Sequence, residues 1–416
     1  MPAPQADPRT AVRRTAVRHD SVTTHLDTDF DRGSRLAYQG NQHDYEELVV
    51  ELQTKGARLE VPVDSRGRRG GAGPADAKAF VLGGMSFTVP TMADFVERSP
   101  YAVSEVDGGY VITRHGTSVA PVSFPARPRF YDLTTADGVP YWHIATLHAT
   151  DVLATTVVQT CIRWNDPADR CKYCGIGISL SNQNTVAVKK PQNLAEVAEA
   201  AVRLDGVKHF TMTMGTINET DKGALYMARC VRAVKAAVDL PIEVQFEPPN
   251  DLEVLREVRE AGADSIGIHI ESFDQAVRER ITPGKARVSV DRYFRAFAKA
   301  VEIFGENQVS SYVLVGLGES PESIIEGCQR LVDIGVYPFV VPLRPIVGTE
   351  MEGVPAPDPE VMDRIYRAVE EMLARRGVRH TDTRAGCVRC GACSGLPAYA
   401  RERPTADGRS LPVFQV

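Results

Sequence analysis

Long apolar runs are missing from this sequence, and none approaches the roughly 18 residues that a membrane-spanning helix needs. The first residues include several arginines, but not the apolar stretch that follows such residues in a secretory signal. Excess positive charge is also missing, because the net charge is −6, which argues against a general nucleic-acid binder. These features predict a cytoplasmic protein that has neither a membrane nor a nucleic acid as its partner.

Cysteines are few, and their distribution is informative. Six of the eight fall in two short groups, which suits metal ligation in a reducing cytosol better than disulfide bonding. The other two, Cys230 and Cys328, lie in segments with helical spacing and are expected to be core thiols. Length and composition are ordinary: 416 residues that are 43% hydrophobic and 25% charged can build a large core in two or three units.

The first cysteine group consists of Cys161, Cys171 and Cys174, and it directly follows an apolar run at 152–160. Three thiolates can bind three irons of a [4Fe-4S] cube and leave the fourth iron open for a small molecule. Zinc is an alternative, but it normally takes four closed ligands in two short-spaced pairs, and no second pair follows at that spacing. Inert buried thiols are the third interpretation.

The tail cysteine group consists of Cys387, Cys390 and Cys393, which form a Cys-x2-Cys-x2-Cys pattern with small residues between the thiols. This pattern is typical of ferredoxin-like Fe–S loops, so we expect a second cluster there, with [4Fe-4S] the favoured type. A zinc knuckle would need a fourth ligand, and His380 is the nearest histidine.

The chain is expected to have four parts. Residues 1–43 are polar and aperiodic, and they predict a flexible tail. Residues 44–150 predict an α+β unit that is rich in strands, with a helix at 45–59, a glycine-rich flexible loop at 65–73 and a β-hairpin at 102–113. The remaining parts are a barrel at 151–350 and a C-terminal helix with the Fe–S cluster tail at 351–416.

Strand-like and helical segments alternate in residues 151–350, which predicts a parallel sheet with right-handed crossovers. The expected strands are 152–160, 207–214, 242–246, 265–269, 309–315 and 339–343. The expected helices are 194–204, 222–238, 252–261, 289–304 and 321–334. Six such units predict an α/β fold, an open (β/α)6 partial barrel of the TIM type. Ligands of such sheets bind at the carboxyl ends of the strands, where the first cysteine group is expected.

After the barrel, a helix is expected at 358–376. The ten residues 377–386 are long enough to fold back over the strand ends. We therefore expect the tail cysteine group near the mouth of the barrel, close to the substrate.

The first cysteine group, with Tyr173 inside its final pair, resembles the motif of the radical S-adenosylmethionine (radical SAM) superfamily. The resemblance covers about residues 150–350 and is greatest to the branch that holds biotin synthase and lipoyl synthase. The usual motif has three residues between its first two cysteines, whereas this chain has nine, including the turn residues Asn165-Asp166-Pro167. The resemblance implies a partial barrel, a [4Fe-4S] cluster and bound S-adenosylmethionine.

The resemblance also implies cofactor contacts at the ends of the second and third strands. Met214, Gly215 and Thr216 stand where the family has a Gly-Gly-Glu-like stretch that meets the methionyl amine, although this chain lacks the acidic residue. An ordinary strand-to-loop glycine is the alternative. Glu247, after the third strand, is a candidate contact for substrate or ribose, or else a carboxylate that caps a loop.

The fourth and fifth strands end in two further similar segments. Gly267–Ser272 is similar to the Asn-(Leu/Ile)-(Asp/Glu)-(Thr/Ser) segment of the same branch, which makes Glu271 and His269 candidate cofactor or substrate contacts. Arg278 suits the cofactor carboxylate through its bidentate fork. Gly316 and Gly318 belong to a stretch similar to one in lipoyl synthase, where glycines let the backbone approach the adenine ring.

Together these features predict a radical SAM enzyme that cleaves S-adenosylmethionine reductively to a 5′-deoxyadenosyl radical. The radical would abstract hydrogen from a small-molecule substrate, with electrons from a donor such as flavodoxin or ferredoxin and a second Fe–S cluster near the active site. Oxidation, rearrangement, fragmentation and sulfur insertion of the biotin or lipoyl synthase type all remain open as the net reaction. A zinc-stabilised binding or scaffold protein is the alternative from another class.

Overall fold

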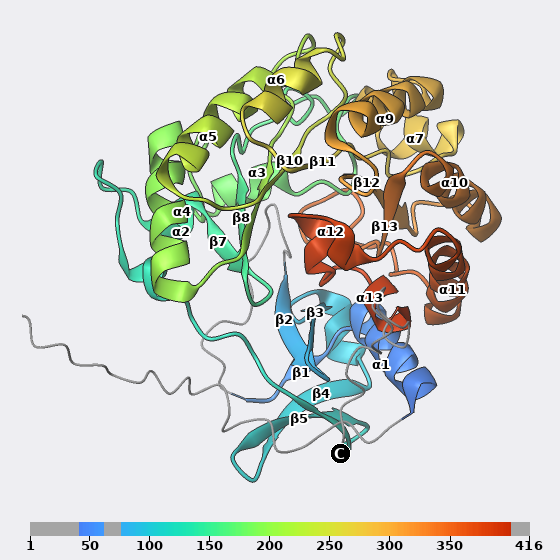
Figure 1. The fold of residues 1–416 in the computed structure, drawn as a ribbon. Helices are drawn as coiled ribbons and strands as arrows, with labels where there is room; N and C mark the ends of the chain where they lie inside the picture. The colour runs from blue at the N-terminus through green and yellow to red at the C-terminus, as the bar shows by residue number, and fades with distance from the viewer. Residues whose placement is uncertain (1–40, 62–75, 401–416) are drawn as a thin grey trace, which may run out of the picture. The chain divides into compact units, whose positions relative to one another are not determined.

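The computed structural model describes residues 41–61 and 76–400. Its central feature is a sheet in the order β13-β12-β11-β10-β9-β8-β7, in which β8 to β13 run parallel and β7 pairs antiparallel to β8 (Figure 1). The bounds are β7 Thr146–His148, β8 Val152–Thr156, β9 His209–Thr213, β10 Ile242–Gln245, β11 Ser265–Gly267, β12 Val309–Val315 and β13 Val336–Pro342. Unbroken sequential order of the parallel strands is the topology of an open (β/α)6 barrel.

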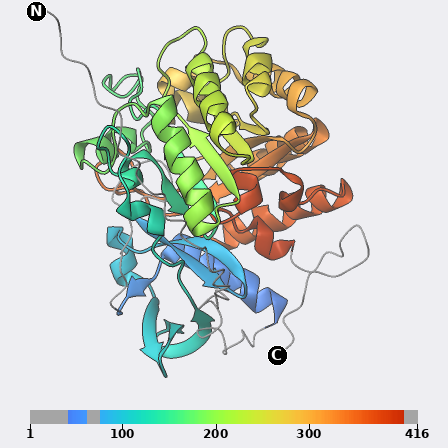
Figure 2. The same cartoon turned by 60° about the vertical axis from the view of Figure 1, so that its left-hand side comes forward.

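Helices connect the parallel strands and cover one face of the sheet, with α4 and α5 in green at the front of Figure 2. The bounds are α3 Ile176–Ser181, α4 Pro191–Asp205, α5 Ala224–Ala237, α6 Val254–Glu260, α7 Gln275–Ile281, α8 Pro283–Ala286, α9 Val290–Phe304 and α10 Pro321–Asp333. The six predicted strands and five predicted helices of the barrel are confirmed. The sequence did not predict β7, α3, α7 or α8, and β13 begins three residues earlier than expected.

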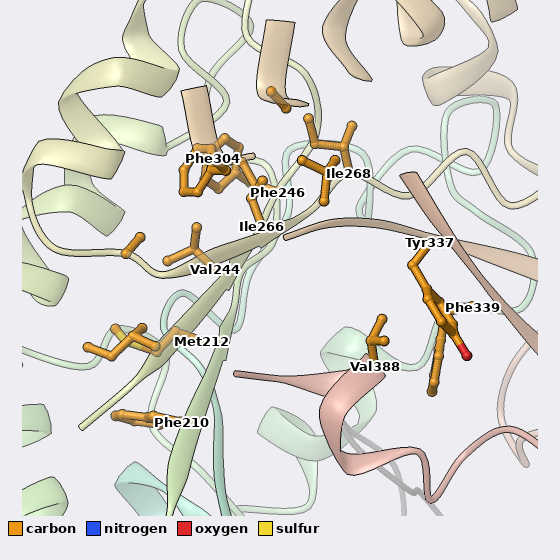
Figure 3. Close-up of a cluster of buried hydrophobic side chains, with 14 of the residues drawn as sticks. Phe210, Met212, Val244, Phe246, Ile266, Ile268, Phe304, Tyr337, Phe339 and Val388 are labelled. Atoms are coloured by element: carbon orange, nitrogen blue, oxygen red, sulfur yellow. The ribbon is translucent and has the colours of Figure 1, made fainter. Parts of the chain in front are cut away.

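The alternation of residues along each strand separates an apolar face from a polar one. Phe210 and Met212 of β9 are fully buried on the face that the helices cover (Figure 3). The residues that alternate with them, His209 and Thr211, point to the opposite, inner face, because successive side chains of a strand alternate. Buried polar groups on an inner face need hydrogen-bond partners, and the C-terminal segment supplies several of them.

Residues 41–61 and 76–124 contribute most of a second hydrophobic core cluster, to which Ala398 of the C-terminal segment also belongs. Helix α1 (Gln42–Lys55) begins with a capping box between Asn41 and Asp44. A hairpin of β2 (Ala77–Leu82) and β3 (Met85–Pro90) lies beside a sheet in the order β1-β4-β5-β6. The remaining strands are β1 Arg58–Leu59, β4 Tyr101–Val106, β5 Gly109–Arg114 and β6 Thr117–Val122.

The predicted hairpin within 102–113 is confirmed by the pairing of β4 with β5. Asp107 and Gly108 at its tip both have positive φ, 52° and 78°, as the two-residue turns of twisted hairpins require. The glycine-rich loop predicted at 65–73 lies outside the described residues, as does nearly all of the tail predicted at 1–43. No helix in the described part of the chain is both long and apolar enough to cross a membrane.

The C-terminal segment contains α11 (Pro359–Arg375), η4 (His380–Asp382), α12 (Cys387–Cys390) and α13 (Leu396–Tyr399). Beyond η4 the chain crosses the amino ends of the barrel strands. Ser265 at the start of β11 donates to the carbonyl of Ala385 (3.0 Å), and the Gly386 amide donates to Nδ1 of His209 at the start of β9 (2.9 Å). Figure 1 shows α12 between the strands of the curled sheet.

The expectation that the tail folds over the mouth of the barrel is therefore wrong. The segment closes the opposite end, since α11 runs back along the sheet after β13 and returns the chain to the amino ends of the strands. There, the backbone of the tail forms hydrogen bonds with polar side chains of the inner face, which would otherwise be buried without hydrogen-bond partners. Val388 of α12 faces Tyr337 and Phe339 of β13 in Figure 3, and the three residues share the barrel core.

Candidate active site

The first cysteine group lies in the loop between β8 and α3, at the carboxyl end of the sheet, as predicted. Its nine-residue insertion is folded on itself. The carbonyl of Asp166 accepts from the Arg170 amide (2.9 Å), and Arg170 Nε donates to the carbonyl of Trp164 (2.6 Å) with its guanidinium over the Trp164 ring. The Cys174 amide donates to the Cys171 carbonyl (3.0 Å), which forms the tight turn of the final pair.

The three thiols lie close enough to affect one another. Burial raises the pKa of Cys174 to about 11, with a smaller upward contribution from the neighbouring Cys161. Burial also raises the pKa of Cys171 well above its usual range, against the nearby cation of Lys285. Buried thiols of this kind ionise only with a compensating positive charge, which metal ions supply.

No three His, Cys, Asp or Glu side chains within 41–61 and 76–400 are close enough to share a single metal ion. Thiolates that bind a cubane each attach to a different iron, so they stand further apart than the ligands of one ion. The role of the first cysteine group as cluster ligands stays a prediction, which the donor types and their burial support.

The stretch after β9 packs directly against the first cysteine group. The Ile162 amide donates to the Thr216 carbonyl (2.9 Å), and the Gly215 amide donates to the Val158 carbonyl (2.9 Å). A Cβ atom at Gly215 would lie 2.1 Å from the Thr160 carbonyl oxygen, so this approach requires glycine. The Met214 side chain is directed into the core against Gly223, so only its backbone could meet a cofactor.

Glu247 forms a buried ion pair with Arg163 of the nine-residue insertion. Arg163 is only 3% exposed and donates from Nε (3.1 Å) and Nη2 (3.0 Å), one bond to each carboxylate oxygen. The Thr216 hydroxyl donates to the same carboxylate (2.6 Å). Burial would raise the pKa of Glu247, but the Arg163 guanidinium holds it below the usual value. Glu247 therefore anchors the cysteine loop, as a loop-capping carboxylate does.

Glu271 pairs with Lys285, a buried residue that sequence reasoning did not single out. Lys285 Nζ donates to both carboxylate oxygens (2.6 and 2.8 Å) and to the His269 carbonyl (2.9 Å). The Tyr173 hydroxyl also bonds the Glu271 carboxylate, which links the final cysteine pair to this ion pair. Burial raises the pKa of Glu271, whereas the Glu271 carboxylate raises the pKa of Lys285 against the effect of burial.

The backbone of Glu271 has φ of +61°, a conformation that costs a residue other than glycine roughly 1–3 kcal/mol. Its carbonyl accepts from the Leu314 amide (2.9 Å) and its amide donates to the Tyr312 carbonyl (3.0 Å), so β12 holds the residue in place. Backbone strain of this kind clusters at active sites and ligand-binding sites, where the surrounding structure holds the residue in its unfavourable conformation.

His269 stacks on Tyr312 with ring centroids 4.4 Å apart, and its Nδ1 accepts from the Tyr312 amide (3.2 Å). Its Nε2 is buried and has no hydrogen-bond partner among the described residues. Burial lowers the pKa of His269 to about 3, with a further contribution from Lys285, so the ring is neutral. A neutral imidazole with an open nitrogen suits a hydrogen bond to a bound ligand.

The buried neutral ring of His269 makes stability depend on pH. Its folded pKa is about 3 and its unfolded pKa is near 6.5, so acid favours the unfolded state between these values. We expect His269→Asn, which keeps the acceptor for the Tyr312 amide, to lose less stability between pH 6 and pH 4. The slopes of the unfolding free energy should differ by about 1.4 kcal/mol per pH unit in denaturant titrations. Equal slopes would mean that the ring is already accessible to protons.

Arg278 is a buried residue of α7. It is 1% exposed, donates to Gln275 Oε1 and to the Lys285 carbonyl (both 3.2 Å), and lies over the Tyr293 ring. These contacts join α7 to α8 and hold the backbone of Lys285. The buried Nε of Arg278 has no hydrogen-bond partner among the described residues, so its contact with a cofactor stays a prediction.

Gly316 and Gly318 follow β12 with positive φ values of 109° and 102°. A Cβ atom at Gly318 would lie 2.6 Å from Nη2 of Arg280, which donates to the Leu317 carbonyl (3.1 Å). The adjacent Glu319 accepts from the Phe273 amide (3.0 Å) and so joins this loop to the end of β11. The glycines occupy the predicted edge of the sheet, and contact with adenine stays a prediction.

The tail cysteine group enters the inner face from the other end of the sheet. The Cys387 amide donates to Glu243 Oε2 (2.9 Å), and Gln245 Nε2 donates to the Cys387 thiol (3.1 Å). Burial raises the pKa of Glu243 to about 7, although the Cys387 amide acts to lower it. Burial also raises the pKa of the Cys387 thiol well above its usual range.

Cys393 differs from Cys387 because a histidine lies beside it. His148 Nε2 is 3.7 Å from the Cys393 thiol, and the Thr88 hydroxyl is 3.6 Å from it. Burial would raise the pKa of Cys393, but His148 lowers it to about 6. In turn, burial would lower the pKa of His148, while Cys390 and Cys393 raise it to about 10. The Cys393 thiol and the His148 imidazole therefore shift each other's pKa in opposite directions.

Comparison with known proteins agrees with this geometry. Residues 167–331 match the model of the Radical SAM superfamily. A lipoyl synthase from Geobacillus sp. (strain WCH70) is 29% identical over 168 residues, which are 39% of this chain and 52% of the relative. Residues 167–331 are therefore a radical SAM domain, and this matched segment contains Cys171 and Cys174. Domains of this family imply a [4Fe-4S] cluster and S-adenosylmethionine.

Other relatives carry different names. The bacteriochlorophyllide c C-7(1)-hydroxylase of Chlorobaculum limnaeum is 24% identical over 233 residues, 51% of this chain and 57% of the relative. The chain thus spans about half the length of the curated relatives that it matches. Among solved structures, a methylornithine synthase is 18% identical with a TM-score of 0.43, covering 59% of this chain and 69% of the other.

The functional residues that sequence reasoning missed are all long-range partners. Arg163 meets a carboxylate 84 positions away, and His148 meets a thiol 245 positions away. Lys285 is nearer to its partner, at 14 positions, but a single lysine after Pro-Gly has no recognisable pattern. The unusual nine-residue spacing between Cys161 and Cys171 was the only sequence signal for these partners. It indicated that the loop is important, but it did not single out Arg163.

Proposed function

We propose that this protein is a radical SAM enzyme that acts on a small molecule held on the inner face of the partial barrel. The observation that carries the proposal is the first cysteine group: three partly buried thiols in one loop, within or beside the segment that matches the superfamily. When bound, the [4Fe-4S] cluster and S-adenosylmethionine supply a 5′-deoxyadenosyl radical that can remove hydrogen from an unactivated carbon.

The chain's own residues hold this site in shape. The first cysteine group would bind the cluster, and the Arg163–Glu247 and Lys285–Glu271 pairs fix the loops on either side of it. Gly215 lets the loop after β9 approach the thiols, and the backbone of Met214–Thr216 would meet the methionyl group. The open Nε2 of His269 would donate to or accept from the ligand. Closure of the far end by the tail would exclude water, which protects a reactive radical.

A direct assay tests the proposal. The wild-type protein would be loaded anaerobically with iron and sulfide, then incubated with S-adenosylmethionine and dithionite. We expect a brown protein that forms 5′-deoxyadenosine and methionine in equal amounts. Iron-loaded protein that forms neither would reject the proposal, and a colourless protein that holds zinc would favour the scaffold alternative. Flavodoxin or ferredoxin would replace dithionite as the physiological donor.

We further propose that the tail cysteine group holds an auxiliary Fe–S cluster, so that substrate lies between two clusters at opposite ends of the inner face. The support is the placement of Cys387 against Gln245 of β10, inside the sheet. Sulfur insertion, with this cluster as the sulfur source, is the second candidate reaction, and the likeness to lipoyl synthases favours it. The likeness to a hydroxylase favours oxidation equally.

Replacement of Cys387, Cys390 and Cys393 together by alanine distinguishes an auxiliary Fe–S cluster from a zinc knuckle. We expect this variant to carry several fewer irons per chain than wild type, because three of the cluster's ligands are gone. It should still cleave S-adenosylmethionine, since the first cysteine group is untouched, but without coupling to substrate. Iron and zinc would be counted by mass spectrometry of the elements. Equal iron in both proteins, with zinc in wild type, would contradict the auxiliary cluster.

A further inference from the structure

We infer that His148 is the fourth ligand of the tail metal site, so that the site is a closed Cys3His set. The inference rests on the proposed auxiliary cluster and adds a ligand that the cysteine pattern does not contain. The sequence pointed to His380 as the nearest histidine. The structure instead brings His148, at the end of β7, against the thiols.

The position of the His148 ring is the first support. Only 9% of the residue is exposed, and Nε2 is 3.7 Å from the Cys393 thiol. The same ring interacts with the Cys390 thiol. His148 therefore faces two of the three tail cysteines, while Cys387 comes from the adjoining turn of α12.

The state of the two ring nitrogens is the second support. Nδ1 of His148 is buried and has no hydrogen-bond partner among the described residues. The polar contacts of the ring are to Cys393 and Cys390, two thiols that are themselves candidate metal ligands, so Nε2 is placed for coordination to the same centre. The neighbouring buried histidine, His209, differs, because its Nδ1 already accepts from the Gly386 amide (2.9 Å).

The surroundings of the site are the third support, because other parts of the chain contact and cover the tail loop. The β2–β3 hairpin covers Cys393: the Thr88 amide donates to the Ala392 carbonyl (2.7 Å). Arg344 Nη2 donates in turn to the Thr88 carbonyl (2.8 Å), and Gln53 donates to the Ala392 carbonyl (3.2 Å). Gln53 and Thr88, both from the N-terminal part of the chain, thus contact the loop that contains Cys393.

A closed ligand set changes the role of the cluster. With His148 bound, no iron is left open, so substrate would not attach to this cluster. Electron transfer or structural closure then fits better than substrate anchoring. The set would also join the β7–β8 hairpin to the C-terminal loop, which closes a chain of more than 200 residues, and metal binding would contribute to folding.

The experiment uses the full chain with the first cysteine group replaced by alanine, so that only the tail cluster remains. This parent protein would be made with 15N-labelled or unlabelled histidine, loaded with iron and sulfide, reduced, and studied by pulsed EPR. We expect a strong nitrogen coupling that changes with the isotope. His148→Cys should keep the iron and lose the coupling. The matched control, His209→Asn, keeps an acceptor for Gly386 and should retain it.

The reduction potential gives a second measurement. Histidine ligation raises the potential of an Fe–S cluster relative to thiolate ligation, so His148→Cys should be harder to reduce than the parent. A tail cluster without histidine coupling would overturn the His148 assignment and leave the auxiliary cluster standing. Failure of the parent to hold iron in the tail would overturn both. If His148→Cys does not fold, the isotope comparison on the parent still decides the question.

Discussion

Replacement of Cys161, Cys171 and Cys174 together by alanine is expected to abolish the reductive cleavage of S-adenosylmethionine. The physical reason is that the three thiolates are the only anchors proposed for the first cluster, and a cluster cannot be held without them. The fold should survive, because all three lie in a loop beyond β8 and none belongs to a strand or helix of the core. Chromatography of 5′-deoxyadenosine measures the activity, and circular dichroism measures the fold.

The chain offers matched controls for this variant in its two core thiols. Cys230 of α5 and Cys328 of α10 are fully buried, as the sequence predicted for them. Cys230→Ala removes a thiol of the same chemistry at a position far from either cysteine group in the sequence. It should keep its iron and continue to form 5′-deoxyadenosine. Reductive cleavage by the triple variant at the wild-type rate would mean that the cluster is bound elsewhere.

The barrel could be predicted because its signals are local. Apolar runs such as 309–315 and helices such as α10 are each defined by a short stretch of chain. Ser320 caps α10 by accepting from the Ser323 amide (3.2 Å), with Pro321 at the first helical position. The parallel topology then fixes which ends of the strands lie together, and this places the first cysteine group without knowledge of any contact.

The position of the tail could not be predicted in the same way. The length of 377–386 allows the chain to reach either end of the sheet, so length alone does not decide between them. The decision comes from His209, Glu243 and Ser265, which pair with the tail backbone. In the sequence these residues read only as polar positions of alternating strands, because their partners lie more than 100 residues away.

The ion pairs of the site were hidden for a related reason. A carboxylate at the end of a strand is visible in the sequence, and Glu247 and Glu271 were both found. Whether such a carboxylate is free to bind a ligand depends on cations that only the fold brings close to it. Arg163 forms an ion pair with Glu247, and Lys285 forms one with Glu271, so the two carboxylates hold loops in place. A family motif in the sequence therefore predicts where a residue lies more reliably than it predicts which groups that residue contacts.

Arg163→Met should therefore be among the most damaging single changes in the chain. It leaves the Glu247 carboxylate buried without its cation, and such a change typically costs about 3–5 kcal/mol. The nine-residue insertion also loses its attachment, so Cys161 should be displaced and iron loading should fall. Urea denaturation of the cluster-free protein measures the first effect. Iron content after anaerobic loading measures the second.

A double variant separates the lost ion pair from lost packing. Arg163→Met with Glu247→Gln removes both charges and keeps a group that can accept from the Thr216 hydroxyl, so it should recover much of the stability. Arg203→Met, which breaks an exposed pair with Glu199, is the surface control and should have no measurable effect. If Arg163→Met were as harmless as the surface control, the pair would not hold the loop. In that case the long insertion before Cys171 would have to be fixed by its own contacts among Trp164, Asp166 and Arg170.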